Sequence, residues 1–309
     1  MSDLKLDEAS EPINPWITHI APADVDLVLA AAPKPVTFWL ELGAFEGGSA
    51  TVATERILAH EFNASVVAVD TFLGDLFMLW TRQPEDRRKM LRKDGGIAIF
   101  DHFRRNVRAA GLQSCILPLQ TTSIVALRLV ALLAERQITP LPQVIYLDSA
   151  HEEGEVLLEL SLAWKALPPG GVLFGDDWVL HEGFKDDNVT VLLEGGTQRD
   201  VLRFAALIEE ELDDEWGLKF QPLRTLGRMR PGLFVSYQSL QWFMKKLSMK
   251  KLSKVKNTWQ QRHPSMSNAG YVCWSIGFQK DGCCNETRFG PGGNSKCWDL
   301  LFTHERCCT

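Results

Sequence analysis

The fold is decided by the stretch Trp39-Leu40-Glu41-Leu42-Gly43-Ala44-Phe45-Glu46-Gly47-Gly48-Ser49. Its apolar beginning continues a run from Val36 and predicts a buried strand, and Ser49 opens a segment with helical spacing. A strand that passes through a glycine turn into a helix is typical of the entrance to a nucleotide-type binding site. Backbone N–H groups can approach a ligand closely at the glycines of this turn, which are Gly43, Gly47 and Gly48.

A second apolar run, 65–70, ends in an acid that comes 27 residues after Gly43. This acid, Asp70, is placed to accept hydrogen bonds from both hydroxyls of a ribose. The turn itself has the spacing Glu-x-Gly-x3-Gly rather than Gly-x-Gly-x-x-Gly. That spacing favours the amino-acid end of S-adenosylmethionine over a pyrophosphate. The alternative, a tight strand–helix turn that binds nothing, stays open at this point.

Strand and helix patterns alternate through five cycles as far as residue 177. This predicts an α/β fold with a doubly wound, mostly parallel, Rossmann-like sheet. Two strand-like runs within 218–237 break the alternation and predict an antiparallel hairpin at one edge. Ligands bind at the carboxyl ends of the strands in such sheets. Acids fall at these ends, namely Glu41, Asp70, Asp148, Asp176 and Asp177.

Three of these acids, Asp148, Asp176 and Asp177, follow two strands that we expect to be neighbours. Carboxylates brought together repel one another unless a cation neutralises them, and all-oxygen ligation suits Mg²⁺ or Ca²⁺. Such an ion can take two neighbouring substrate oxygens and lower the pKa of a hydroxyl. The alternative is that the Asp-Asp pair only caps a turn or a helix.

His151 lies three residues after Asp148. An imidazole beside a metal site can accept a hydroxyl proton close to neutral pH, so His151 is the candidate catalytic base. The alternative is a histidine at a helix start that bonds only to the backbone.

Five blocks of sequence carry a family resemblance: residues 41–50, 70–74, 103–112, 146–151 and 169–178. In this order they resemble the class I S-adenosylmethionine-dependent methyltransferases of the macrocin O-methyltransferase and methyltransferase family 24 type. The resemblance covers residues 36–240. It implies metal ligands at Asp148, Asp176 and Asp177, and a histidine at the place of His151. It implies cofactor contacts from Glu41, Gly43, Gly47, Gly48, Ser49, Asp70, Thr71, Ser123 and Asp148.

The residues and the resemblance together predict a metal-dependent O-methyltransferase. It would move a methyl group from S-adenosylmethionine to a hydroxyl of a small molecule, either a sugar diol or a catechol-like compound. The alternative is a non-catalytic scaffold of the same fold that carries a Cys-rich binding module. The chain has a net charge of −6, and residues 240–264 carry +7, which leaves −13 elsewhere. This acidic body argues against nucleic acid as a partner. An oligomer stays open.

The sequence predicts four parts: an arm at 1–20, the methyltransferase domain at 21–240, a basic linker at 241–265 and a module at 266–309. Residues 71–97 interrupt the alternation and are the expected lid over the site. Six of the seven cysteines lie in the last part, in two copies of the pattern Cys-Trp-x3-Phe-x4-Cys-Cys. This duplication predicts a small module held together by disulfides.

The sequence leaves two locations open. The acidic, polar N-terminus does not read as a signal peptide, which favours the cytoplasm. Disulfide bonds in the tail would instead require a secretory lumen. No apolar run reaches the length of a transmembrane segment.

Overall fold

The computed structural model describes residues 20–74, 90–92, 94–149, 151–152, 154–178, 185–186, 189–190, 196–216, 226–236, 239–249, 251 and 284. The chain divides into two compact units, Met1–Ser248 and Met249–Thr309. The fold described below is that of the first unit. Most of the expected lid, most of the basic linker and the duplicated tail, apart from Cys284, lie outside the described residues. Within the described part of the chain, no helix is both long and apolar enough to cross a membrane.

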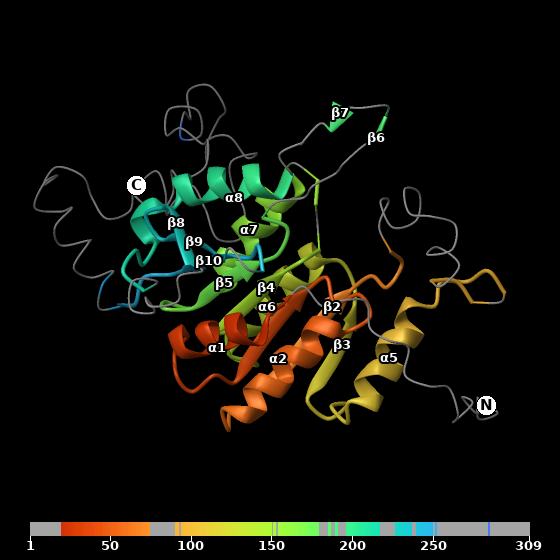
Figure 1. Ribbon diagram of the computed structural model, residues 1–309. Coiled ribbons are helices and arrows are strands. Elements are labelled where there is room, and N and C mark those ends of the chain that lie inside the picture. The colour runs from red at the N-terminus through yellow and green to blue at the C-terminus, as the bar shows by residue number, and fades with distance from the viewer. Residues whose placement is uncertain are drawn as a thin grey trace, which may run out of the picture. The chain divides into compact units, whose positions relative to one another are not determined.

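A central sheet is built from strands that follow the alternation expected from the sequence. The strands are β1 (Phe38–Leu42), β2 (Ser65–Asp70), β3 (Ile116–Gln120), β4 (Val144–Leu147), β5 (Val172–Gly175), β8 (Leu226–Arg230), β9 (Leu233–Ser236) and β10 (Trp242–Lys245). Their order is β3-β2-β1-β4-β5-β10-β9-β8 (Figure 1). The first five run parallel, whereas β10 is antiparallel to both β5 and β9 and β8 is antiparallel to β9. The doubly wound, mostly parallel sheet with an antiparallel edge is therefore confirmed. A separate hairpin pairs β6 (Lys185–Asp186) with β7 (Val189–Thr190).

Helices cover both faces of the sheet (Figure 1). They are α1 (Pro22–Ala31), α2 (Gly48–Ala59), α5 (Ile99–Ala109), α6 (Ser123–Glu135), α7 (Glu155–Ala166) and α8 (Gly196–Leu207), with a 3-10 turn at Glu209–Glu211. Apolar residues of α1, α2 and α5 pack with Trp39 on one face, and those of α6, α7 and α8 pack with Leu40 on the other. Neighbouring side chains of β1 thus enter different cores, and all five residues of the strand are buried.

The order of the strands reverses between β1 and β4. From β1 the chain moves outward through β2 to β3, and it then returns to the other side of β1 as β4. The crevice outside the carboxyl ends of the strands at such a reversal is where ligands bind in this kind of sheet. The two residues that follow the strands here are Gly43 and Asp148. Both therefore stand at the expected binding position.

Gly43 and Asp148 meet so closely that a side chain on Gly43 is excluded. The N–H of Asp148 donates to the carbonyl of Leu42 at 2.8 Å, which extends the pairing of β1 with β4 by one residue. A Cβ on Gly43 would lie 1.8 Å from the carbonyl oxygen of Asp148. Gly43 also has a φ of +89°, in the left-handed region that favours glycine. This explains the first glycine of the motif as a packing requirement.

The structured sheet continues past residue 240, where the sequence placed the start of a linker. Strand β10 runs from Trp242 to Lys245 between β5 and β9, and Trp242, Phe243 and Met244 are completely buried. The first compact unit ends only at Ser248. The apolar start of the segment expected to be a linker thus supplies an inner strand of the sheet.

The contact between the ends of β1 and β4 predicts the stability of a glycine variant. Gly43→Ala should lower the free energy of unfolding by about 2–5 kcal/mol, about 1–2 kcal/mol from the left-handed backbone and about 1–3 kcal/mol from the clash. Gly111→Ala is the matched control, because Gly111 has a φ of +72° but no atom lies within 4 Å of the added Cβ. Urea unfolding followed by tryptophan fluorescence measures both. Equal losses would contradict the close approach.

Candidate functional site

The turn between β1 and α2 is fixed to the end of β2. The N–H groups of Gly43 and Ala44 donate to the carbonyl of Val69, at 2.8 and 3.1 Å. Gly47 has a φ of +85° and is the N-cap of α2, which begins at Gly48. Because the start of a helix attracts a carboxylate, this turn suits the amino-acid part of a cofactor.

Glu41 is the buried acid at the centre of this turn. Its Oε1 accepts a hydrogen bond from Ser49 Oγ at 2.5 Å, and the residue is completely buried. Burial raises the pKa of Glu41 to about 8, the hydrogen bond from Ser49 opposes that shift, and the charge of Asp70 adds to it. Glu41 is therefore mainly protonated at neutral pH. Among the described residues, its Oε2 has no hydrogen-bond partner.

Asp70 at the end of β2 is held by two backbone donors. Its Oδ2 accepts from the N–H of Phe45 at 2.8 Å, and its Oδ1 accepts from the N–H of Phe72 at 2.6 Å. A carboxylate oxygen has more than one acceptor position, so these bonds orient Asp70 and leave it able to accept hydroxyl donors. The hydroxyl of the neighbouring Thr71 accepts from the N–H of Leu73 at 3.3 Å.

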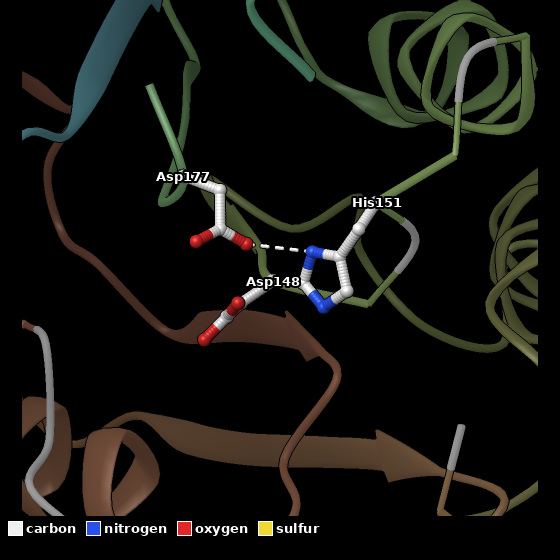
Figure 2. Close-up of side chains that lie close together, drawn as sticks. All are labelled: Asp148, His151 and Asp177. Carbon is white, nitrogen blue, oxygen red and sulfur yellow. Dashed lines mark ion pairs between the residues drawn. The ribbon is translucent and has the colours of Figure 1, made fainter. Parts of the chain in front are cut away.

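Asp148, His151 and Asp177 form a cluster at the ends of β4 and β5 (Figure 2). One ligand atom from each residue lies within 4.8 Å of the others. His151 Nδ1 lies 2.6 Å from Asp177 Oδ2. Asp177 has a φ of +57°, which is uncommon for a residue with a side chain and is found most often where function requires it.

The cluster differs in one member from the metal set expected from the sequence. Asp176 is buried beside it but is not among the three residues whose ligand atoms come together. Its main-chain carbonyl accepts from Trp242 Nε1 at 2.9 Å. His151 supplies the third ligand atom of this cluster, and the ligand set expected from the sequence, Asp148, Asp176 and Asp177, stays a prediction.

The electrostatics of this edge favour a bound cation. Burial raises the pKa of Asp148 well above its ordinary value, and the charges of Asp176 and Asp177 raise it further, while His151 opposes the shift. Burial and the same carboxylates also raise the pKa of Tyr146, whose hydroxyl lies 3.5 Å from Asp148 Oδ2. Asp148, Asp176 and Asp177 thus lie close together, and His151 is the basic side chain that opposes the rise in the pKa of Asp148.

Ser123, an expected cofactor contact, donates a hydrogen bond from its hydroxyl to a residue that the sequence did not single out. That residue is Glu159 of α7, which also accepts from Ser149 Oγ at 2.9 and 2.8 Å. Glu159 is almost completely buried, and burial raises its pKa although both serines oppose the shift. It connects the start of α6 to the loop after β4. The sequence did contain one signal for this role, because Glu159 is an acid at an inward-facing position of the largely apolar helix α7.

A second missed residue, Asp200 of α8, fixes the loop that carries His151. It is buried, and its Oδ2 accepts from the N–H groups of Gly154 and Leu157 at 2.6 and 3.0 Å. Asp200 therefore caps the start of α7 from a different helix. The sequence offers no pattern for this contact, because the bonded residues lie 46 and 43 positions apart in the chain.

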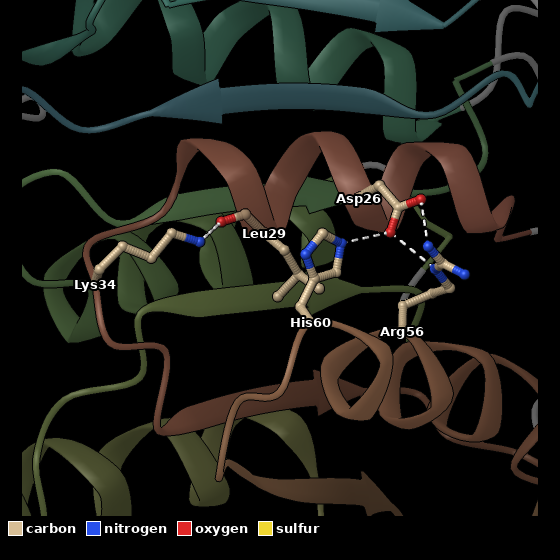
Figure 3. A network of polar contacts seen from close by, with 5 residues as sticks. All are labelled: Asp26, Leu29, Lys34, Arg56 and His60. Atoms are coloured by element: carbon tan, nitrogen blue, oxygen red, sulfur yellow. Dashed lines mark hydrogen bonds and ion pairs between the residues drawn. The ribbon is translucent and has the colours of Figure 1, made fainter.

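A polar network away from the strand ends has a structural role (Figure 3). Arg56 of α2 forms two hydrogen bonds of 2.8 Å with Asp26 of α1, and His60 Nε2 lies 2.9 Å from the same carboxylate. Partial burial raises the pKa of Asp26, but the bonds from Arg56 and His60 outweigh it and the pKa is lowered. Because these side chains are about one third exposed, the network holds α1 on α2 with little net energy.

The comparison with protein families decides what kind of domain this site belongs to. Residues 40–178 match the model of the family Methyltransf_24, described as a methyltransferase domain. This part of the chain therefore matches a methyltransferase domain. The matched residues contain the glycine turn, Asp70 and the whole Asp148, His151 and Asp177 cluster of this methyltransferase domain.

Solved structures give a more distant likeness to the methyltransferase domain. An O-methyltransferase from Bacillus cereus in complex with SAH is 15% identical, with 74% of this chain and 82% of that chain covered and a TM-score of 0.42. The O-methyltransferase TomG from Streptomyces achromogenes, in complex with SAM, is 14% identical, with 74% and 81% covered and a TM-score of 0.42. No curated protein matches the chain.

The buried state of Glu41 predicts a pH dependence of stability. Its pKa is about 8 in the folded chain against an ordinary value of 4.5. The protonated Glu41 therefore makes its full contribution to the free energy of unfolding below the pKa that Glu41 has in the unfolded chain. This contribution falls by about 1.4 kcal/mol per pH unit as the pH rises toward the pKa of Glu41 in the folded chain. Glu41→Gln cannot ionise and should flatten this part of the profile. Urea unfolding of both proteins across this window is the measurement, and parallel profiles would contradict the assignment.

Proposed function

We propose that this domain transfers the methyl group of S-adenosylmethionine to a hydroxyl oxygen of a small molecule. The observation that carries the proposal is the direct contact between Gly43, in the cofactor turn, and Asp148, in the acid cluster. A methyl group held beside the turn would face an acceptor held beside the cluster. The family match and the O-methyltransferases among the similar structures support the same reaction.

The cofactor would lie along the end of β1. The start of α2, at Gly48 and Ser49, would face its amino-acid part, with Glu41 in neutral form beneath it. Asp70 would accept the ribose hydroxyls while its two backbone bonds keep the carboxylate in place. Ser123 would lie beside the adenine, and its hydroxyl would keep the hydrogen bond that it donates to Glu159.

The donor set fits a divalent cation. The carboxylates of Asp148 and Asp177 come together beside the imidazole of His151, and burial, followed by the charges of Asp176 and Asp177, raises the pKa of Asp148. An ion here, when bound, would neutralise the acids and lower the pKa of a substrate hydroxyl. Oxygen ligands suit Mg²⁺ or Ca²⁺, and the nearby imidazole also admits Mn²⁺. Two adjacent substrate oxygens, as in a sugar diol or a catechol, match such a site.

His151 would act as the base. Its contact with Asp177 fixes the ring and favours a proton on Nδ1, which leaves the lone pair of Nε2 to accept the hydroxyl proton. As that proton leaves, the substrate oxygen forms its bond to the methyl carbon, and the bond from the methyl carbon to the sulfur breaks. The remaining role of the chain is to align the two reactants and to stabilise charge.

Calorimetry with S-adenosylmethionine tests the cofactor part. The unmodified chain should bind it, and Asp70→Asn should weaken binding about tenfold, since a charge-assisted hydrogen bond to the ribose is lost. Asp214→Asn is the control, because Asp214 is an exposed acid whose partner is Arg228. Absence of binding by the unmodified chain, with and without divalent ions, would reject the enzyme and favour the non-catalytic scaffold.

Mn²⁺ binding, followed by electron paramagnetic resonance, tests the metal part. Asp148→Asn and Asp177→Asn should each weaken binding at least about tenfold, because each removes a negatively charged ligand. Asp176→Asn is the matched control and should have a smaller effect, because Asp176 lies outside the cluster. An equal loss of Mn²⁺ affinity in all three variants would instead indicate that Asp148, Asp176 and Asp177 all bind the ion, as the sequence predicts.

The role of His151 needs a separate variant. His151→Gln should leave the affinity for Mn²⁺ nearly unchanged and abolish methyl transfer to a panel of catechols and sugar diols. A loss of Mn²⁺ affinity equal to that of Asp148→Asn would make His151 a ligand in place of a base.

A further inference from the structure

Helix α5 forms hydrogen bonds to Glu46 of the glycine turn. His102 Nδ1 lies 2.7 Å from Glu46 Oε1, and Asn106 Nδ2 donates to the main-chain carbonyl of Glu46 at 2.9 Å. His102 and Asn106 are four residues apart and therefore share one face of the helix. All three residues are buried. Bonds to both the side chain and the main chain fix where Glu46 lies and how it is turned.

The same face of α5 packs directly on the next residue of the turn. A Cβ on Gly47 would lie 2.9 Å from Cδ2 of Phe103, so no side chain fits between the helix and the turn. Gly47 is the N-cap of α2, with a φ of +85°. The position of α5 thus determines where α2 begins.

Helix α5 contacts one of the two backbone donors that hold Asp70 and the sequence neighbour of the other. Phe45 precedes Glu46, has a φ of +43° and donates its N–H to Asp70. Phe72, the second donor, packs its ring on Phe103 with a centroid distance of 5.2 Å. A left-handed residue such as Phe45 persists only where its surroundings hold it, and Glu46 is its immediate neighbour. Through these contacts α5 also constrains the orientation of Asp70.

Stability alone accounts poorly for these polar groups. Replacement of both partners of a buried hydrogen bond by apolar groups of the same shape is often nearly neutral or stabilising. Two further acceptors beside the pair, Glu46 Oε2 and Asn106 Oδ1, are buried without a donor among the described residues. Such groups cost desolvation energy and call for another explanation.

We propose that His102 and Asn106 are positioning residues, which act through Glu46 to hold the glycine turn and Asp70 in the arrangement that binds S-adenosylmethionine. The identity of the ligand rests on the proposed function, whereas the hold on the turn can be measured without a ligand. His102 and Asn106 touch Glu46 and are not themselves at the proposed cofactor position.

The central variant is His102→Leu, which keeps an apolar volume on the helix and removes the bond to Glu46. The affinity for S-adenosylmethionine, measured by calorimetry on the full chain, should fall about tenfold, the scale of one charge-assisted hydrogen bond. Hydrogen exchange without ligand should become faster at residues 43–49 and 70–72 and stay unchanged in β5. Arg108→Leu, on the exposed side of α5, is the matched control and should change neither quantity.

A conservative variant separates positioning from general damage to the fold. His102→Asn keeps a nitrogen donor near the position of Nδ1, and it should recover most of the affinity and of the exchange protection. The proposal is overturned if His102→Leu leaves exchange at 43–49 unchanged, or if His102→Asn is as damaged as His102→Leu. If the unmodified chain binds no cofactor, the proposed function fails, and the exchange measurement still decides whether α5 holds the turn.

Discussion

The close contact between Gly43 and the carbonyl of Asp148 is the constraint on which the rest of the site depends. It requires a glycine after β1, because any Cβ would overlap the carbonyl oxygen. It also places the turn that follows β1 against the acids that follow β4. The reversal of strand order at this point creates the crevice, and the missing side chain keeps the two sides of the crevice in contact. The glycine turn and the acid cluster are therefore neighbours by construction of the sheet.

The second feature of the site is the number of acids that it keeps out of water. Glu41 and Asp148 both have raised pKa values, chiefly through burial, and the charges of neighbouring carboxylates raise them further. This arrangement costs stability in the absence of ligand. A sulfonium cofactor and a divalent ion are both cationic, so an acidic edge of this kind is suited to attract them. Stability and ligand binding are thus opposed at the same residues.

The sequence predicted those features that local pattern controls. Alternation of apolar runs gave the parallel sheet, and acids at strand ends gave Asp70, Asp148 and Asp177 in the right region. It failed where a residue acts through a partner from a distant segment. Asp200 caps a helix far from it in the sequence, and Glu159 bonds serines of two other elements. The contacts of α5 with Glu46 were not predicted, because helical spacing does not reveal which turn the polar side chains of a helix will meet.

Strand β10 shows the same limit at the level of the fold. Its four residues begin a lysine-rich segment, and composition alone assigned them to a linker. Pairing with β5 on one side and β9 on the other, which only the folded chain provides, turns Phe243 into a core residue. Composition describes a segment as a whole, whereas burial is decided residue by residue.

The most direct test of the account is a crystal structure of the full chain grown with S-adenosylhomocysteine. The account predicts the amino-acid part of the ligand along Gly43–Ser49, the ribose hydroxyls on Asp70 and the sulfur facing the side of the crevice that holds Asp148 and His151. A ligand bound elsewhere, or bound at the turn with its sulfur directed away from Asp148, would contradict the joining of cofactor and acid cluster into one site.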